Sequence, residues 1–169
     1  ASIELIEPSL GAPDHPWEMM VALIDQHHPH LQKAKIALLW RGGWTPNPDG
    51  LLTMGQAQKA TDVDAALHGY DFAILLNAEK WPTLTPAQQR ALLDHELCHC
   101  TYAKNKAGAP KLDDEGRLQW RLRAHDLEEF GEIVERHGAW NHEIQRVVDA
   151  AGNAQLALPL EAEVATEPS

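Results

Sequence analysis

Apolar residues recur at helical spacing in the segment 16–28 of the chain. They lie three or four residues apart, as on one face of a helix: Trp17, Met20, Val21 and Ile24. Pro16 suits the first turn of this predicted helix, and Pro29 ends it. The preceding residues 1–15 contain proline and aspartate without such a pattern, so they are expected to form an irregular lead-in.

Two short apolar runs have the length and the flanking residues of buried strands. The first, AKIALLWRGG (34–43), ends at two glycines, and the second, YDFAILLN, begins at residue 70 and ends near Asn77. The segment 51–69 between them is ambiguous. It fits either a strand followed by a loop or a strand followed by a short helix.

A capped helix is predicted from Thr85 onward. Thr85 is a good N-cap, Pro86 suits the first helical position, and Gln88 completes a capping box. No glycine or proline follows until Gly108, so a helix of about twenty residues is expected. Its apolar residues lie on nearly all sides, which is typical of a central, buried helix.

The C-terminal third of the chain is dominated by helical patterns. Residues 117–138 have a helical pattern with an apolar face, which either is continuous or breaks near His125, and they end at Gly138, a suitable C-cap. Residues 139–152 show a second such face. The tail 153–169 is acidic and is expected to be disordered. Early strands followed by helices favour an α+β fold, with one domain over residues 16–152.

The bulk composition limits the classes of function. Apolar residues make up 44% of the 169 residues, as in globular domains, and no apolar run is long enough to span a membrane. The net charge of -11 repels phosphate backbones and disfavours nucleic-acid binding. No secretory signal is recognisable, and Cys98 and Cys100, which point in different directions on a helix, suit a reducing compartment such as the cytoplasm.

The segment LLDHELCHCT (92–101) contains the strongest chemical signal. His95 and His99 are four residues apart, so on a helix both can give an imidazole nitrogen to one zinc ion. Glu96 lies about 100° further round the helix, where it can hold a metal-bound water and take its proton. The alternative is a pair of ordinary hydrogen-bonded histidines, but burying such groups without partners costs about 1–3 kcal/mol each.

A catalytic zinc needs a third protein ligand. The densest group of candidates downstream is AHDLEEF (124–130), in which His125 is favoured and Glu128 or Glu129 are the alternatives. Other histidines downstream are His137 and His142. An aspartate next to a ligand, Asp94 or Asp126, could orient its imidazole, although a surface charge is the simpler interpretation of each. The histidines of DQHHPH (25–30) are interpreted as an exposed helix end.

ALLDHELCHC (91–100) and AHDLEEFGEIVERHGAW (124–140) resemble the metallopeptidase family of bacteriophage and prophage genomes, and are similar, more distantly, to SprT-like zinc proteases. The resemblance covers roughly residues 35–140. It implies a minimal zincin fold, with a small sheet packed over the active-site helix, in a bacterial host cell. It also implies that the zinc ligands are His95, His99 and His125 and that Glu96 is the general base.

The predicted function is therefore zinc-dependent hydrolysis of peptide bonds in a protein or peptide substrate. An extended substrate is expected to pair with an edge strand, for which residues 70–77 are the candidate. Two alternatives stay open. One is a catalytically silent zinc-binding interaction module of phage origin, and the other is a zinc hydrolase that acts on small amides or cell-wall peptides.

Overall fold

The computed structural model describes residues 2–124, 131–138 and 140–141 of the chain. A sheet in the order β1-β2-β4-β3 is made of β1 (Ile3–Leu5), β2 (Ile36–Arg41), β3 (Gly55–Lys59) and β4 (Phe72–Asn77). A separate ladder joins β5 (Cys100–Tyr102) to β6 (Trp120–Leu122). The helices are α1 (Pro16–His27), α2 (Asp62–His68), α3 (Pro86–His99) and α4 (Gly131–His137), with 3-10 turns at Pro29–Lys33 and Trp81–Thr83. The fold is therefore α+β, as predicted.

Strand β4 is the interior strand of the larger sheet. It pairs in parallel with β2 on one side and antiparallel with β3 on the other, and all six of its residues are buried. The prediction that residues 70–77 form a substrate-binding edge is therefore wrong, because both of its ladder edges are occupied. The edge strand on this side is β3, and no strand of the described residues pairs with its outer edge.

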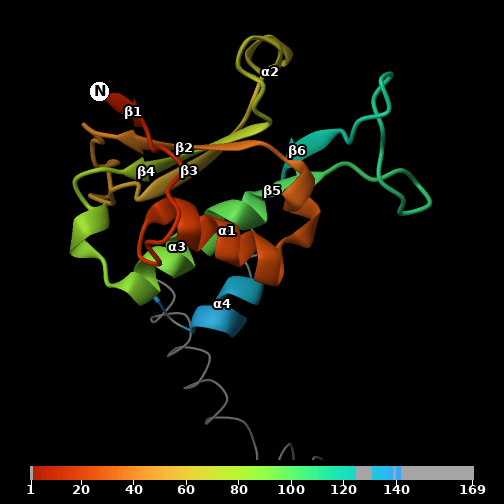
Figure 1. The fold of residues 1–169 in the computed structure, drawn as a ribbon. Coiled ribbons are helices and arrows are strands. Elements are labelled where there is room, and N and C mark those ends of the chain that lie inside the picture. Colours follow the sequence, from red (N-terminus) through yellow and green to blue (C-terminus); the bar gives the residue numbers. More distant parts are fainter. Residues whose placement is uncertain (1, 125–130, 139, 142–169) are drawn as a thin grey trace, which may run out of the picture.

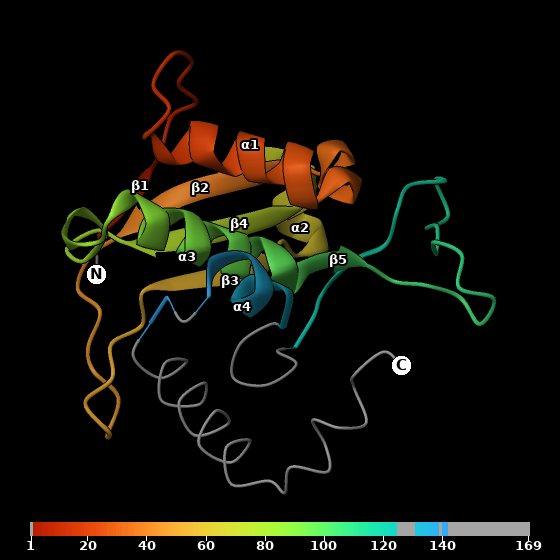
Figure 2. The ribbon, with the colours of Figure 1, turned by 90° about the horizontal axis from the view of Figure 1, so that it is seen from below.

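Helices α1 and α3 cover one face of the sheet, and α4 packs on the outside of α3 (Figures 1 and 2). The core lies between this helical layer and the sheet. Its fully buried side chains include Leu38, Phe72, Ile74 and Leu76 from the strands and Leu93 and Leu97 from α3. These contacts fix α3 as the central helix, as its apolar surroundings in the sequence predict. None of the described helices is long and apolar enough to cross a membrane.

Helix α3 begins where the sequence predicts and ends earlier. The Thr85 side chain accepts from the Gln88 N–H, and the Gln88 side chain accepts from the Thr85 N–H, so the capping box is confirmed. The helix stops at His99, because the chain enters β5 at Cys100: the Cys100 N–H still donates to the Leu97 carbonyl, but the His99 carbonyl accepts from the Arg123 N–H beside β6. A strand partner distant in sequence has thus overridden the local helical pattern.

Other segments differ from the sequence pattern. Residues 3–5, expected to be irregular, form β1 against β2. The segment 51–69 contains a strand and then a short helix, the second of its two interpretations. The helical pattern expected over 117–138 is wrong at Trp120–Leu122, which is a strand, and is confirmed at Gly131–His137, while residues 125–130 lie outside the described residues. Residues 142–152 and the tail 153–169 lie outside the described residues.

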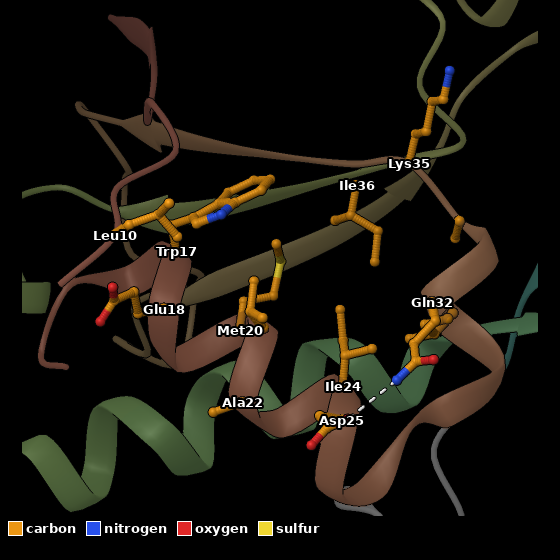
Figure 3. A pocket seen from close by; sticks show the side chains of 13 residues that line it. Leu10, Trp17, Glu18, Met20, Ala22, Ile24, Asp25, Gln32, Lys35 and Ile36 are labelled. Atoms are coloured by element: carbon orange, nitrogen blue, oxygen red, sulfur yellow. Dashed lines mark hydrogen bonds between the residues drawn. The ribbon is translucent and has the colours of Figure 1, made fainter. Parts of the chain in front are cut away.

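A hollow of about 760 Å³ lies between α1 and the start of β2 (Figure 3). Apolar side chains such as Trp17, Met20, Ile24 and Ile36 line it. All of its lining residues belong to the segment 10–36, so it does not include the HExxH histidines.

Candidate metal centre

The two HExxH histidines lie side by side on α3. The ring centroids of His95 and His99 are 5.2 Å apart, with the ring planes inclined at 68°. Two imidazoles bound through nitrogen to one tetrahedral zinc have ring centres about 5 Å apart, because each zinc–nitrogen bond is about 2.0–2.1 Å long. The spacing of the rings fits a shared metal ion.

A backbone carbonyl fixes the orientation of the His99 ring. Nδ1 of His99 lies 2.6 Å from the carbonyl oxygen of Arg123. A carbonyl only accepts, so Nδ1 donates, and the neutral ring then has its lone pair on Nε2. The Arg123 N–H in turn donates to the His99 carbonyl at 2.7 Å. Holding one ring nitrogen in this way is the usual means of orienting a metal-binding histidine.

Glu96 lies between α3 and the edge strand β3. Its side chain is buried, and Oε1 is 4.0 Å from Nε2 of His95. A Cβ atom placed on Gly55 would stand 3.2 Å from the same Oε1 and 3.3 Å from Cδ1 of Leu92. The missing side chain of Gly55 therefore makes the room that the Glu96 carboxylate occupies.

The predicted third ligand, His125, lies outside the described residues, as do its alternatives Glu128 and Glu129 and the neighbouring Asp126. The chain reaches this segment from beside His99, since Arg123 contacts it directly. On the other ligand, the ring centroid of His95 is 6.4 Å from that of Trp140.

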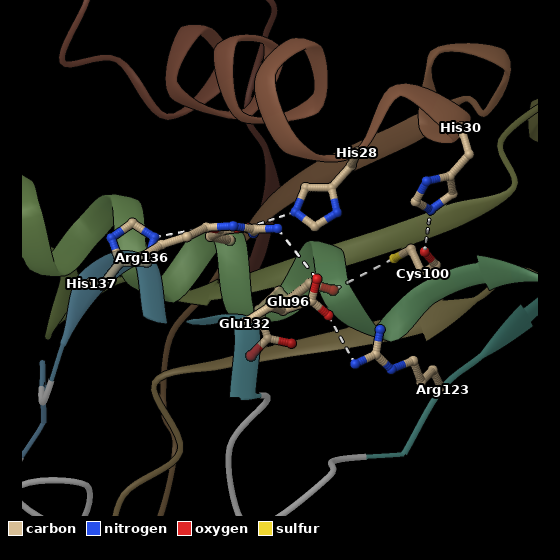
Figure 4. Close-up of polar contacts among 9 residues, drawn as sticks. His28, His30, Glu96, Cys100, Arg123, Glu132, Arg136 and His137 are labelled. Atoms are coloured by element: carbon tan, nitrogen blue, oxygen red, sulfur yellow. Dashed lines mark hydrogen bonds and ion pairs between the residues drawn. The ribbon is translucent and has the colours of Figure 1, made fainter. Parts of the chain in front are cut away.

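Asp94, the residue before His95, is fully buried in an ion-pair network (Figure 4). Its carboxylate accepts from His28 at 2.6 Å, from Arg136 at 2.7 Å and from His137 at 2.8 Å. Burial alone would raise the pKa of Asp94, but the hydrogen bonds from His28, His137 and Arg136 outweigh it and lower the pKa to about 2. The network joins α3 to the end of α1 and to α4.

Two interpretations made from the sequence are corrected by this network. Asp94 is no surface charge, and His28, expected at an exposed helix end, is only 3% exposed. The sequence did contain one signal for the burial of Asp94. A carboxylate on a helix that is apolar nearly all round must find partners from other elements, because its burial is otherwise too costly.

A second group of possible metal ligands overlaps the same network. Ligand atoms of His28, Asp94 and Cys98 all lie within 4.8 Å of one another. The 2.6 Å between Nε2 of His28 and the Asp94 oxygen is a hydrogen-bond length, whereas two ligands of a tetrahedral zinc lie about 3.3 Å apart. Arg136 already neutralises that oxygen, and burial raises the pKa of the Cys98 thiol. These residues fit an ion-pair network better than a metal site.

Paired histidines beside a buried glutamate, on a helix that packs under a small sheet, define the class of metal-dependent peptidases. The chain belongs to a family of this class, because the model of the family described as "Putative phage metallopeptidase" matches residues 13–152. Membership implies a metal ion and a protein or peptide substrate. Neither the curated proteins nor the solved structures contain a match to the chain.

Proposed function

We propose that the protein is a zinc-dependent peptidase with a minimal zincin-like fold, in which His95, His99 and His125 hold the metal and Glu96 is the general base. The observation that carries the proposal is the pair of adjacent imidazoles, with ring centroids 5.2 Å apart, next to a buried carboxylate. When bound, zinc polarises the scissile carbonyl and acidifies the attacking water. Glu96 accepts the proton of that water and passes it to the leaving amine.

His125 is preferred as third ligand because of where the chain leaves the described residues. The Arg123 carbonyl touches the His99 ring. In the sequence, His125 follows Arg123 by only two positions. Glu128 and Glu129 are three and four residues further along and are less restrained. His137 donates to Asp94 instead.

The outer edge of β3 is the proposed binding site for an extended substrate. This strand packs on α3 next to Glu96 (Figure 2). A peptide added to this edge would form main-chain hydrogen bonds, which give affinity without demanding a particular sequence. It would also bring a scissile bond close to the Glu96 carboxylate.

We place the enzyme in the cytoplasm of a host cell. This rests on Cys98 and Cys100, which are both free thiols and both buried. Free thiols persist in reducing compartments.

The deciding experiment compares the purified protein with its Glu96→Gln variant. Both should bind zinc, and the variant should hydrolyse a mixed peptide library about 100- to 10,000-fold more slowly, because it lacks the general base. Bound zinc is measured by atomic absorption and hydrolysis by mass spectrometry. A protein that binds zinc and cleaves nothing in either form would instead be a silent zinc-binding module.

The third ligand is tested by His125→Ala, with His68→Ala as the matched control. His68 is an exposed residue at the end of α2. Loss of a ligand should sharply lower the zinc content, while the control keeps it. Unchanged zinc in His125→Ala would exclude this histidine and direct the search to Glu128 and Glu129.

A further inference from the structure

A series of ion pairs and one hydrogen bond runs from Asp94 to His99, both on α3. Figure 4 labels three of its residues, Arg123, Glu132 and Arg136. Asp94 accepts from Arg136 at 2.7 Å, and Arg136 pairs with Glu132 at 3.3 Å. Glu132 pairs with Arg123 at 2.9 Å, and the Arg123 carbonyl accepts from His99. We call these three intervening residues, Arg123, Glu132 and Arg136, the strap.

The strap connects elements that are distant in sequence. Arg136 and Glu132 are one turn apart on α4, and Arg123 directly follows β6. Asp94 and His99 are both on α3, at either end of the HExxH segment. The strap therefore connects α4 and the end of β6 to α3 at both ends of the HExxH segment.

The pair of Arg123 and Glu132, the outer link of the strap, contributes little to stability. The side chains of Arg123 and Glu132 are 32% and 35% exposed, and half-exposed pairs of this kind add little to the free energy of unfolding. The buried pair of Asp94 and Arg136 would hold α4 in place without them. What the outer link does add is a restraint on the Arg123 side chain, besides the 2.7 Å hydrogen bond from the Arg123 N–H to the His99 carbonyl, and the carbonyl of Arg123 sets the tautomer of His99.

We propose that Glu132 and Arg136 are positioning residues of the metal centre, which hold the Arg123 carbonyl against Nδ1 of His99 and so aim Nε2 of that ring at the metal. The inference rests on the proposed function, because it takes His99 to be a ligand. Neither residue is required to touch the metal or the substrate. Their effect passes through a hydrogen bond to a ligand, and loss of such partners lowers metal affinity about 10- to 100-fold.

The test uses Glu132→Ala in the full chain, with Glu115→Ala as the matched control. Glu115 also forms a glutamate–arginine pair, with Arg117 at 2.8 Å, but its side chain is 71% exposed and lies in the loop between β5 and β6. Glu132→Ala breaks the strap at a half-exposed helix position, where alanine keeps the helix. Glu132→Gln removes the charge and keeps the shape.

Two measurements are made on each protein. Zinc affinity is measured by competition with a chelator, and the His99 tautomer is measured by nitrogen NMR of the metal-free protein, with the signal assigned by comparison with His99→Gln. We expect Glu132→Ala to bind zinc about tenfold more weakly than the parent and to show a mixture of tautomers. Glu132→Gln should lie between, and Glu115→Ala should match the parent in both.

The outcomes separate the strap from the proposed function. If the parent binds zinc and Glu132→Ala binds it as tightly as Glu115→Ala does, the strap has no positioning role. If the parent binds no zinc, the proposed function fails, and the tautomer in metal-free protein then decides about the strap. An Nδ1-protonated His99 in Glu132→Ala, as in the parent, would overturn it.

Discussion

Helix α3 presents two clusters of histidine and carboxylate that share residue types and differ in surroundings. On one side, Asp94 accepts from His28, His137 and the guanidinium of Arg136. On the other, Glu96 lies against Gly55 of an edge strand. In the first cluster an arginine neutralises the buried carboxylate, so this cluster is a structural joint, a set of ion pairs that holds α1, α3 and α4 together. A carboxylate at a sheet edge, beside paired imidazoles, is the group to which the proposed function assigns the role of general base.

The comparison shows that neighbouring residues of one helix receive their roles from other elements. Asp94, His95 and Glu96 are consecutive, and helical geometry turns each about 100° from the last. Asp94 therefore meets α1 and α4, whereas Glu96 meets β3. Substitution of Asp94 should act chiefly on the stability of the fold, whereas substitutions around Glu96 should act on the reaction.

The largest effect on stability is expected from Asp94→Ala. This change leaves Arg136 and His28 buried or half-buried without their shared acceptor, and breaking a buried pair from one side costs about 3–5 kcal/mol. Urea unfolding of the metal-free protein measures it, with the exposed Glu115→Ala as control. A loss below about 1 kcal/mol would mean that the Asp94 cluster is no structural joint.

Acid should weaken the same joint by about 2 kcal/mol. The folded-state pKa of Asp94 is about 2, below its ordinary value of 3.8, so the carboxylate stabilises the fold at pH above about 4. That contribution is lost as pH falls from about 4 to 2, when the Asp94 carboxylate, which faces His28, Arg136 and His137, takes up a proton. Between pH 5 and 2, the free energy of unfolding should fall more steeply with falling pH for the parent than for Asp94→Asn. Equal slopes would contradict the assignment of this pKa to Asp94.

The smallest of these effects is expected from Gly55→Ala, on the other side of α3. Gly55 is not among the glycines with positive φ, so alanine fits the backbone, and its methyl would meet Oε1 of Glu96 at 3.2 Å. We expect kcat to fall about tenfold, which corresponds to roughly 1.4 kcal/mol, with the metal retained and KM less affected. Gly55→Val should lose more. Unchanged kcat in both variants would show that Glu96 does not depend on this gap.

Local signals account for what the sequence predicted well. The capping box at Thr85 and Gln88 uses residues three apart, and β4 is a continuous apolar run because it is covered on both faces. The HExxH spacing is local as well, and it brought His95 and His99 together on one face. Each of these depends on residues within about one turn or one strand.

The features that the sequence did not predict depend on distant partners. The early end of α3 requires β6, and β1 is a strand only because β2 lies beside it. Asp94 meets His28 across 66 positions and Arg136 across 42. The group that orients His99 is a backbone carbonyl, which every residue has, so no residue type could have marked Arg123 for this role.

If His99 binds the metal, as proposed, the junction of α3 and β5 has a consequence for how the ion is captured and kept. His99 is the last residue of the helix and Cys100 the first of the strand, with no linker in between. The main chain at His99 is therefore immobilised on both sides when the protein folds, and its conformational entropy is lost then rather than on metal capture. Such rigidity favours a long residence time of the bound ion over rapid exchange with metal ions in solution.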